Sequence, residues 1–285
     1  MKKVSYWLSL PLLYLIAILP FPVLYFLSDI FKILIFDIVG YRKQVILTNL
    51  RNSFPNKSEK EINEISVKFQ RNFTDMLLEC VKMLTLTQTQ LARRFKITNP
   101  EFLLKLQENN RGIIGVVGHV INWEWAGLIQ SQSSPHATMI IYKPLENTFF
   151  DKLVLNMRSK FGAVLVPMKL TLRKLIEYKN KPYILVLAGD QYPGKGENVY
   201  KTTFLNQTTY VFLGTERTAK MMDAAVVFCS IKKVKRGHYA VTFELLEEHP
   251  KATPDGVITE KHIRFLEEQI IDQPDTWLWS HKRWK

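Results

Sequence analysis

An uncharged N-terminal run, Val4 to Ser28, constrains this chain more than any other feature, because so long an apolar segment can cross a lipid bilayer. It reads VSYWLSLPLLYLIAILPFPVLYFLS and follows two lysines. About 20 apolar residues make a membrane-spanning helix, whereas the apolar region of a cleaved signal peptide, the alternative interpretation, has only about 7–15 residues. We therefore expect residues 1–40 to form an N-terminal membrane anchor ahead of one domain over residues 41–285.

Three prolines in this run leave a second interpretation open. Pro11, Pro20 and Pro22 can kink a helix or end it early, and the segment would then enter the membrane interface without crossing it. The next apolar stretch, Ile30 to Val39, contains a lysine and an aspartate, so it fits an interfacial position better than a spanning one.

The formal net charge of +13 favours an anionic partner, which means nucleic acid, an anionic membrane surface or an acidic substrate. Nucleic acid is disfavoured, because the sequence has a long apolar run and no helix-turn-helix, zinc-finger or RNA-recognition signature. The two cysteines, Cys80 and Cys229, are isolated, and there is no clustered Cys/His set. We therefore expect no metal site, no cofactor and a reducing compartment.

The spacing of apolar residues predicts an α/β fold. Tyr41 to Pro55 reads as a basic amphipathic helix, and Ser58 with Glu61 forms a capping box ahead of a long helix with an apolar core face. From Gly112 onwards, short apolar runs alternate with helical segments, which is typical of a mostly parallel central sheet flanked by helices. The expected strands are 112–117, 138–142, 163–166, 183–188, 225–231 and 239–245, and the expected helices are 123–130, 147–161, 170–179, 215–222 and 259–271.

The segment GIIGVVGHVINWEWAG holds the best candidate for a reactive site. A buried strand runs into Gly118 and His119, and open α/β sheets place their active groups at the carboxyl ends of strands. His119 and Glu124 form an H-x-x-x-x-E pattern, whose two side chains would face different ways on one regular helix. A turn between them, for which Asn122 is a suitable residue, would let the two side chains meet.

Such a pair suits acyl transfer to an alcohol. A neutral imidazole takes up a hydroxyl proton well near pH 7, and a carboxylate on its other nitrogen fixes the tautomer and stabilises the imidazolium. No serine nucleophile is needed if the alcohol attacks a thioester directly. The pattern also occurs by chance, so the alternative interpretation of His119 is a histidine with a structural role only.

Further motifs follow one another in a specific order: YRKQVILTNLRNSFP after the apolar run, then GHVINWEW, YKPLEN with Arg158 shortly after it, LAGDQYPGKG, and WLWSHKRWK. Together they resemble the late acyltransferases of lipid A biosynthesis, a bacterial family of lauroyl- and myristoyltransferase-like enzymes with an H-x4-D/E motif. The resemblance covers nearly the whole chain. One departure concerns the segment that shapes the substrate cavity, where Phe204-Leu205-Asn206 stands in place of the family's F-F-G.

This resemblance implies a glycerolipid-acyltransferase-like fold in an enzyme of the bacterial inner membrane, with its catalytic domain facing the cytoplasm. The implied reaction moves a fatty-acyl chain from an acyl-carrier-protein thioester, or from a coenzyme A thioester, to a hydroxyl of a lipid A precursor. His119 would be the general base, oriented by Glu124. The alternative acceptor is a lysophospholipid or an aminolipid, which the same pair would serve.

Other residues become candidates through the resemblance or through their position. Arg158 would contact an anionic headgroup or the thioester oxygen, and Asp190 with Gln191 would support the site from a strand end; the alternatives are a solvated basic face and an ordinary loop turn. A basic cluster over 169–181 would bind anionic lipid, phosphate or the carrier protein, or would simply be solvated. The full set of substrate-binding candidates is Tyr142, Asn147, Arg158, Asp190 and Gln191, and the tryptophans expected at the membrane interface are Trp123, Trp125, Trp277, Trp279 and Trp284.

Overall fold

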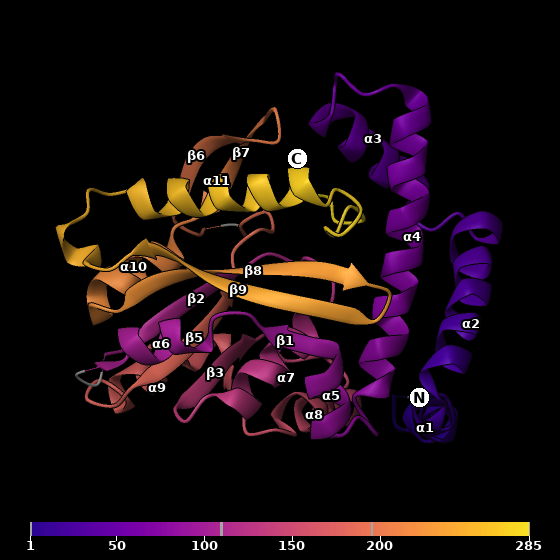
Figure 1. Cartoon of the computed structure of the whole chain (residues 1–285), viewed down its shortest axis with the longest axis horizontal. Helices are drawn as coiled ribbons and strands as arrows, with labels where there is room; N and C mark the ends of the chain where they lie inside the picture. The colour runs from indigo at the N-terminus through magenta and orange to yellow at the C-terminus, as the bar shows by residue number, and fades with distance from the viewer. Residues whose placement is uncertain (1, 109–110, 195, 285) are drawn as a thin grey trace.

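A seven-stranded, mostly parallel sheet forms the centre of the chain within residues 2–108, 111–194 and 196–284, which the computed structural model describes (Figure 1). The strand order is β1-β9-β8-β2-β5-β3-β4, and β9 runs antiparallel to β8. The strands are β1 Phe95–Ile97, β2 Ile113–Val117, β3 Ala137–Tyr142, β4 Val164–Pro167, β5 Tyr183–Ala188, β8 Ala225–Lys235 and β9 His238–Glu247, and a separate hairpin is formed by β6 Val199–Phe204 and β7 Gln207–Phe212. The predicted α/β class is confirmed.

Helices cover both faces of this sheet. Figure 1 shows α11 above the sheet and α5 to α9 below it, so that β2, which lies between β5 and β8, is buried along its whole length. Such double coverage explains why β2 is apolar throughout rather than alternating. The helices after residue 40 are α3 Lys43–Ser53, α4 Glu59–Lys82, α5 Gln88–Arg94, α6 Pro100–Leu106, α7 Trp123–Ser133, α8 Thr148–Ser159, η3 Met168–Leu170, α9 Thr171–Glu177, α10 Gly214–Met222, η4 Pro250–Ala252 and α11 Val257–Asp272.

The expected elements agree with the observed ones to within a few residues at their ends. The predicted capping box is confirmed, because the Ser58 hydroxyl accepts from the Glu61 backbone N–H while the Glu61 carboxylate accepts from the Ser58 backbone. The short strand β1 and the β6–β7 hairpin were not expected. Both hairpin strands are rich in threonine and alternate between exposed and covered residues, so they contain no continuous apolar run.

The expected N-terminal membrane helix is not found as one continuous element. The run is divided into α1 Lys2–Ile18 and α2 Phe21–Lys32, which continues into a π-helical turn, η1 Ile33–Ile38. Pro20 stands at the break with an extended ψ of 148°. A proline has no backbone N–H to donate, and it disfavours helical geometry at the residue before it, here Leu19. Among the described residues, no helix is both long enough and apolar enough to cross a membrane.

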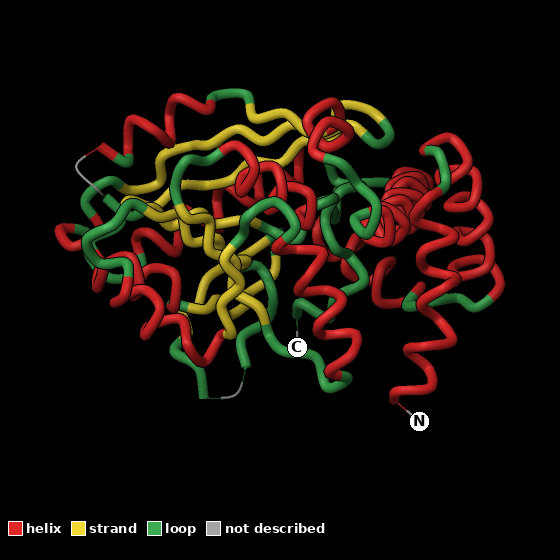
Figure 2. Tube along the Cα trace, turned by 90° about the horizontal axis from the view of Figure 1, so that it is seen from below, coloured by secondary structure: helices red, strands yellow, loops and turns green. Residues whose placement is uncertain are grey.

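The N-terminal helices pack against the long helix α4, and Figure 2 shows only helices at this end of the molecule. The ammonium group of Lys82 donates to the backbone oxygens of Ala17 and Leu19 at 2.7 Å each, and the Thr85 hydroxyl also donates to the Ala17 oxygen. These carbonyls lie at the carboxyl end of α1, where a positive charge and added donors are favourable. The N-terminal helices are therefore held against α4 by polar contacts as well as by apolar packing.

The expectation that tryptophans line a membrane interface is wrong for three of them. Trp125, Trp277 and Trp279 are among the largest fully buried side chains. Their indole N–H groups donate to the oxygen of Glu79, to Asp190 and to the oxygen of Pro274, respectively. A buried tryptophan needs such a partner. The partners of Trp125 and Trp277 lie 46 and 87 residues away in the sequence, whereas Pro274 is five residues from Trp279.

Candidate active site

His119 and Asp190 are brought together by the register of two parallel strands. In the pairing of β2 with β5, Val117 lies opposite Ala188. Each strand then continues through one glycine to its polar residue, so His119 and Asp190 reach the same edge of the sheet side by side. The glycines are required by close packing: a Cβ on Gly118 would come within 2.6 Å of Leu266, and one on Gly189 within 2.8 Å of His262, both on α11.

Asp190 holds both the backbone and the ring of His119. One carboxylate oxygen lies 2.5 Å from Nδ1 of the imidazole, and the other accepts from the His119 backbone N–H at 2.7 Å. That second oxygen also accepts from the Trp277 indole N–H at 2.8 Å. The Asp190 side chain is only 2% exposed, so it faces protein on all sides. With Nδ1 engaged, the other ring nitrogen, Nε2, points away from Asp190.

The electrostatics of this pair follow from burial and charge. Burial alone would lower the pKa of His119, but the charge and hydrogen bond of Asp190 outweigh it and raise that pKa above its ordinary value. Burial would likewise raise the pKa of Asp190, whereas the imidazole and the N–H donors around the carboxylate hold it well below its usual range. Asp190 is therefore a fixed negative charge at neutral pH, and His119 is a stronger base than a free imidazole.

Glu124 does not occupy the position expected of it. Its carboxylate binds the guanidinium of Arg158 in a two-pronged ion pair, in which Nε donates to Oε2 at 2.8 Å and the terminal nitrogen donates to Oε1. The carboxylate on the second nitrogen of His119 thus belongs to Asp190, and the expectation that Glu124 orients the imidazole is corrected. The physical reason is geometric: α7 begins between the two residues and carries Glu124 towards α8 instead. Glu124 and Arg158 still act electrostatically on His119, since the first raises its pKa and the second lowers it.

The turn between these residues, 119–124, is called the site turn below. Asn122 lies in the left-handed region with φ 48° and ψ 43°, and its side-chain oxygen accepts from the Trp125 backbone N–H at 3.0 Å, which caps α7. The turn predicted at Asn122 is confirmed. Residues 276–278, called the closing segment below, pair with the site turn. Leu278 donates its N–H to the oxygen of His119 at 3.1 Å, and Val120 and Trp277 form an antiparallel bridge.

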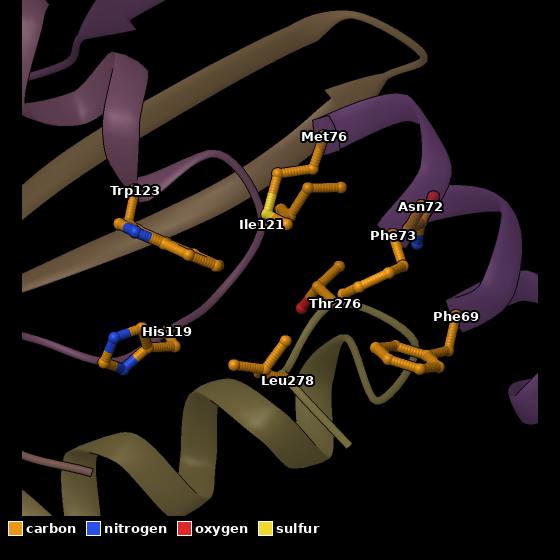
Figure 3. A pocket seen from close by; sticks show the side chains of 9 residues that line it. All are labelled: Phe69, Asn72, Phe73, Met76, His119, Ile121, Trp123, Thr276 and Leu278. Carbon is orange, nitrogen blue, oxygen red and sulfur yellow. The ribbon is translucent and has the colours of Figure 1, made fainter. Parts of the chain in front are cut away.

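A small, mostly apolar recess opens beside His119 (Figure 3). Figure 3 shows His119 at one end, with Trp123 and Leu278 next to it and side chains of α4 at the other end. Three segments contribute the lining: α4, the site turn and the closing segment. The lining residues are Phe69, Asn72, Phe73, Met76, His119, Ile121, Trp123, Thr276 and Leu278. The recess is small, with a cavity volume of about 10 Å³, and its lining is mainly apolar.

The remaining candidates lie around this centre. Gln191 is exposed, and its side-chain nitrogen is 3.3 Å from Nε2 of His119. Tyr142 ends β3 and pairs in register with Pro167, so it stands on the strand beyond β5. Asn147 caps α8, the helix of Arg158, by accepting from the Phe149 N–H at 3.1 Å. The structure thus joins five of the candidates directly, His119 with Asp190 and Gln191 and Glu124 with Arg158. It places the other two, Tyr142 and Asn147, along the same edge.

Trp277 is a contributor that sequence reasoning did not assign to the site. Its W-x-W context was recognised only as part of a motif, and its indole contact with Asp190 depends on the tertiary fold. Within the described part of the chain, no group of three or more His, Cys, Asp or Glu side chains is placed to hold a metal ion. The structure is thus an α/β fold in which a histidine–aspartate pair lies at the carboxyl ends of two neighbouring parallel strands.

Comparison with known proteins makes this more specific. The sequence profile of the family described as "Bacterial lipid A biosynthesis acyltransferase" matches residues 1–285. The chain therefore belongs to the bacterial lipid A biosynthesis acyltransferase family, and it is an acyltransferase of lipid A biosynthesis. It is 24% identical over 283 residues to the lipid A biosynthesis lauroyltransferase of Escherichia coli (strain K12), and 22% identical over 284 residues to the palmitoleoyltransferase of the same organism. Each match covers 98% of this chain and 90% of the relative.

Proposed function

We propose that His119 takes the proton from a hydroxyl of a lipid A precursor while that oxygen attacks an acyl thioester. The observation that carries this proposal is the contact of Asp190 with Nδ1, because a carboxylate there favours the neutral tautomer with its proton on Nδ1, in which Nε2 is available as the base. Gln191, 3.3 Å from Nε2, marks the direction from which a hydroxyl would approach. As the C–O bond forms, the proton moves to Nε2, and Asp190 stabilises the imidazolium. When the tetrahedral intermediate collapses, the imidazolium returns that proton to the departing thiolate.

Arg158 is the group that would meet the negative charge of the reaction. Glu124 holds one edge of its guanidinium with two hydrogen bonds, and this bidentate pair keeps a planar cation near His119. A fixed cation at this position would stabilise the oxyanion of the tetrahedral intermediate or bind a phosphate of the acceptor. In this proposal Glu124 contributes to the reaction through Arg158, and the imidazole is oriented by Asp190.

The donor is proposed to be an acyl-carrier-protein thioester, with a coenzyme A thioester as the alternative. Six apolar side chains gather beside His119, and such a surface would favour an acyl chain packed against it, close to the base: Phe69, Phe73, Met76, Ile121, Trp123 and Leu278. An acidic carrier protein suits the charge of +13. Tyr142 and Asn147, along the same edge, are proposed to contact the substrate.

The function is tested by the lipids of a strain that lacks the gene. We expect lipid A without one secondary acyl chain, observed by mass spectrometry as a loss of one acyl mass, and restored when the intact gene is returned. The reason is that acylation of a hydroxyl on a hydroxyacyl chain adds one ester-linked chain per site. Unchanged lipid A together with an altered phospholipid or aminolipid would instead identify the alternative acceptor.

We further propose that the enzyme works on the cytoplasmic side of the bacterial inner membrane, held there by its N-terminal helices. Leucines at positions 8, 12 and 15 of α1 are 75%, 59% and 60% exposed. Near η3 and α9, Met168, Leu172 and Ile176 are also exposed and lie one helical turn apart, with basic residues between them. Apolar side chains beside lysines and arginines are typical of helices that lie in a membrane interface.

Membrane binding should therefore have two parts that respond differently to salt. We expect the full-length protein to sediment with membranes and to stay there in high salt, because burial of the α1 leucines is hydrophobic. Replacing Leu8, Leu12 and Leu15 together by serine should release most of the protein when salt is added. Replacing Lys169 and Arg173 by glutamine is the matched control and should change only the salt-sensitive part. Complete release of the unaltered protein by salt alone would contradict the proposal.

A further inference from the structure

A buried carboxylate lies directly beneath the site turn. Glu79 of α4 is fully buried and accepts hydrogen bonds from the Tyr25 hydroxyl at 2.6 Å and from the Asn122 amide at 2.5 Å. The Tyr239 hydroxyl lies 2.9 and 2.8 Å from its two oxygens. Burial raises the pKa of Glu79 to about 7, and the three donors oppose that rise. These donors come from α2, β9 and the site turn, so one side chain joins three elements that are far apart in the sequence.

The bond to Asn122 determines the conformation of the site turn. Asn122 lies in the left-handed region, which few non-glycine residues adopt and which asparagine tolerates when its side chain is hydrogen-bonded. Both ends of the Asn122 amide are engaged, because its oxygen caps α7 and its nitrogen donates to Glu79. Trp125 reinforces the contact by donating its indole N–H to the Glu79 backbone oxygen at 3.2 Å. The direction of the turn, and with it the position of Glu124 relative to His119, therefore depends on Glu79.

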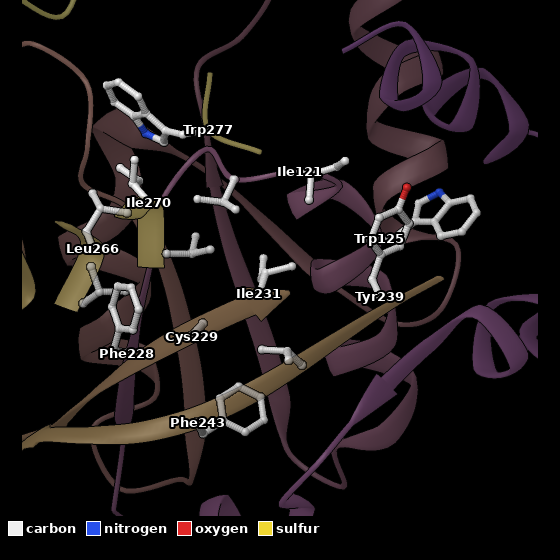
Figure 4. Packing of buried hydrophobic residues seen from close by; sticks show 14 of the residues in the cluster. Ile121, Trp125, Phe228, Cys229, Ile231, Tyr239, Phe243, Leu266, Ile270 and Trp277 are labelled. Atoms are coloured by element: carbon white, nitrogen blue, oxygen red, sulfur yellow. The ribbon is translucent and has the colours of Figure 1, made fainter. Parts of the chain in front are cut away.

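The Tyr25 hydroxyl connects this network to the N-terminal helices. Tyr25 lies on α2, and Arg236 holds this helix against α4. The Arg236 guanidinium pairs with Asp29 of α2 and with Asp75 of α4, and it also donates to the Tyr25 backbone oxygen at 3.1 Å. From the same helix, the ring of Phe21 packs edge-on against the Trp125 indole, with centroids 6.1 Å apart. Figure 4 shows Trp125 and Tyr239 side by side at this place.

We propose that Glu79 is a positioning residue for acyl transfer. Through Tyr25, the geometry of the site turn would then depend on how α2 packs against α4. This inference rests on the proposed function, since it assumes that His119 and the Glu124–Arg158 pair carry the reaction. A displaced Asn122 would move Glu124 and Arg158 relative to His119 while leaving the exposed surfaces of the other elements in place. Loss of the network should therefore lower kcat more than it changes KM.

The experiment compares Tyr25→Phe with Tyr14→Phe, a matched removal of a hydroxyl from an exposed tyrosine on α1. Acyl transfer from an acyl-carrier-protein thioester to a lipid A precursor is measured with the full-length protein and normalised to folded molecules. We expect Tyr25→Phe to lower kcat about 3- to 10-fold, the effect of one lost buried hydrogen bond, with KM for the thioester unchanged. Tyr14→Phe should match the unaltered protein. Glu79→Gln should lower kcat further, and adding Tyr25→Phe to it should change little, because the two residues act through one contact.

Several results would overturn the inference while leaving the proposed function intact. One is an unchanged kcat per folded molecule in Tyr25→Phe, even if its melting temperature falls; another is a rise in KM alone. If Tyr25→Phe does not fold, Asn122→Gly tests the positioning role instead. Glycine tolerates the left-handed conformation and is nearly as good a helix cap as asparagine, but it cannot donate to Glu79. A normal kcat in Asn122→Gly would reject the positioning role. Failure of the proposed function is recognised separately, by near-normal activity of His119→Ala.

Discussion

His119→Ala is expected to lower turnover by about 100- to 10,000-fold, the usual contribution of a general base. The imidazole is the group next to the apolar recess that can take up a hydroxyl proton at neutral pH, and its removal leaves Asp190 buried with two N–H donors still bound. Because the backbone N–H of residue 119 keeps its bond to Asp190, the site turn should retain its shape. Measurement requires acyl transfer from an acyl-carrier-protein thioester, normalised to the amount of folded protein.

A histidine with a structural role only would give a different pattern. His119→Ala would then lower the melting temperature and the yield, while each folded molecule kept near-normal activity. Circular dichroism and thermal unfolding of the variant separate these two cases. His136→Ala is a suitable control, because it replaces another histidine of the same chain that lies beyond α7, just before β3. Near-normal specific activity of His119→Ala would remove the basis of the proposed mechanism.

Asp190→Asn is expected to lower turnover by about 1,000- to 10,000-fold, although it keeps the shape of the side chain. An amide in this position can donate to Nδ1, which would move the ring proton to Nε2 and leave no base facing the substrate. The stabilisation of the imidazolium by the carboxylate is also lost.

By contrast, Glu124 has no hydrogen bond to the imidazole within the described structure. Glu124→Gln should therefore disturb Arg158 while leaving the tautomer of His119 intact.

The role of Asp190 also predicts how kcat/KM depends on pH. The base must be unprotonated, so kcat/KM should rise with pH through the pKa of His119, which Asp190 holds above its ordinary value of about 6.5. In Asp190→Asn the negative charge is gone while burial remains, so that limb of the pH profile should move to lower pH. An unmoved limb, or a loss of activity matched by an equal loss of folded protein, would show that Asp190 does not act on His119.

Most of the fold was predictable from local pattern. Runs such as YILVLA and AVVFCSI have the length and composition of buried strands, and the segments between them have helical spacing. The capping box at Ser58 was predictable because it lies within four consecutive residues. The β6–β7 hairpin was not, since its threonine-rich strands depend on pairing with each other rather than on an apolar run.

The candidate residues of the site were also predictable, but their pairing was not. His119 and Glu124 are close in sequence, and that closeness suggested a direct contact between them. The contact that forms is with Asp190, 71 residues further along, because β2 lies next to β5 in the sheet and their register aligns the two strand ends. Strand adjacency is a property of the whole topology and leaves no local trace in the sequence.

The sequence by itself determined the α/β class, the position of His119 at a strand end and the presence of a long apolar N-terminal segment. Only the tertiary structure decided that Asp190 holds the imidazole, that Glu124 turns to Arg158, and that Glu79 joins α2 to the site turn. The physical reason is the range of the forces involved. Apolar periodicity and capping act over a few neighbouring residues, whereas hydrogen bonds between buried polar groups are set by whichever chain segments packing brings within about 3 Å of each other.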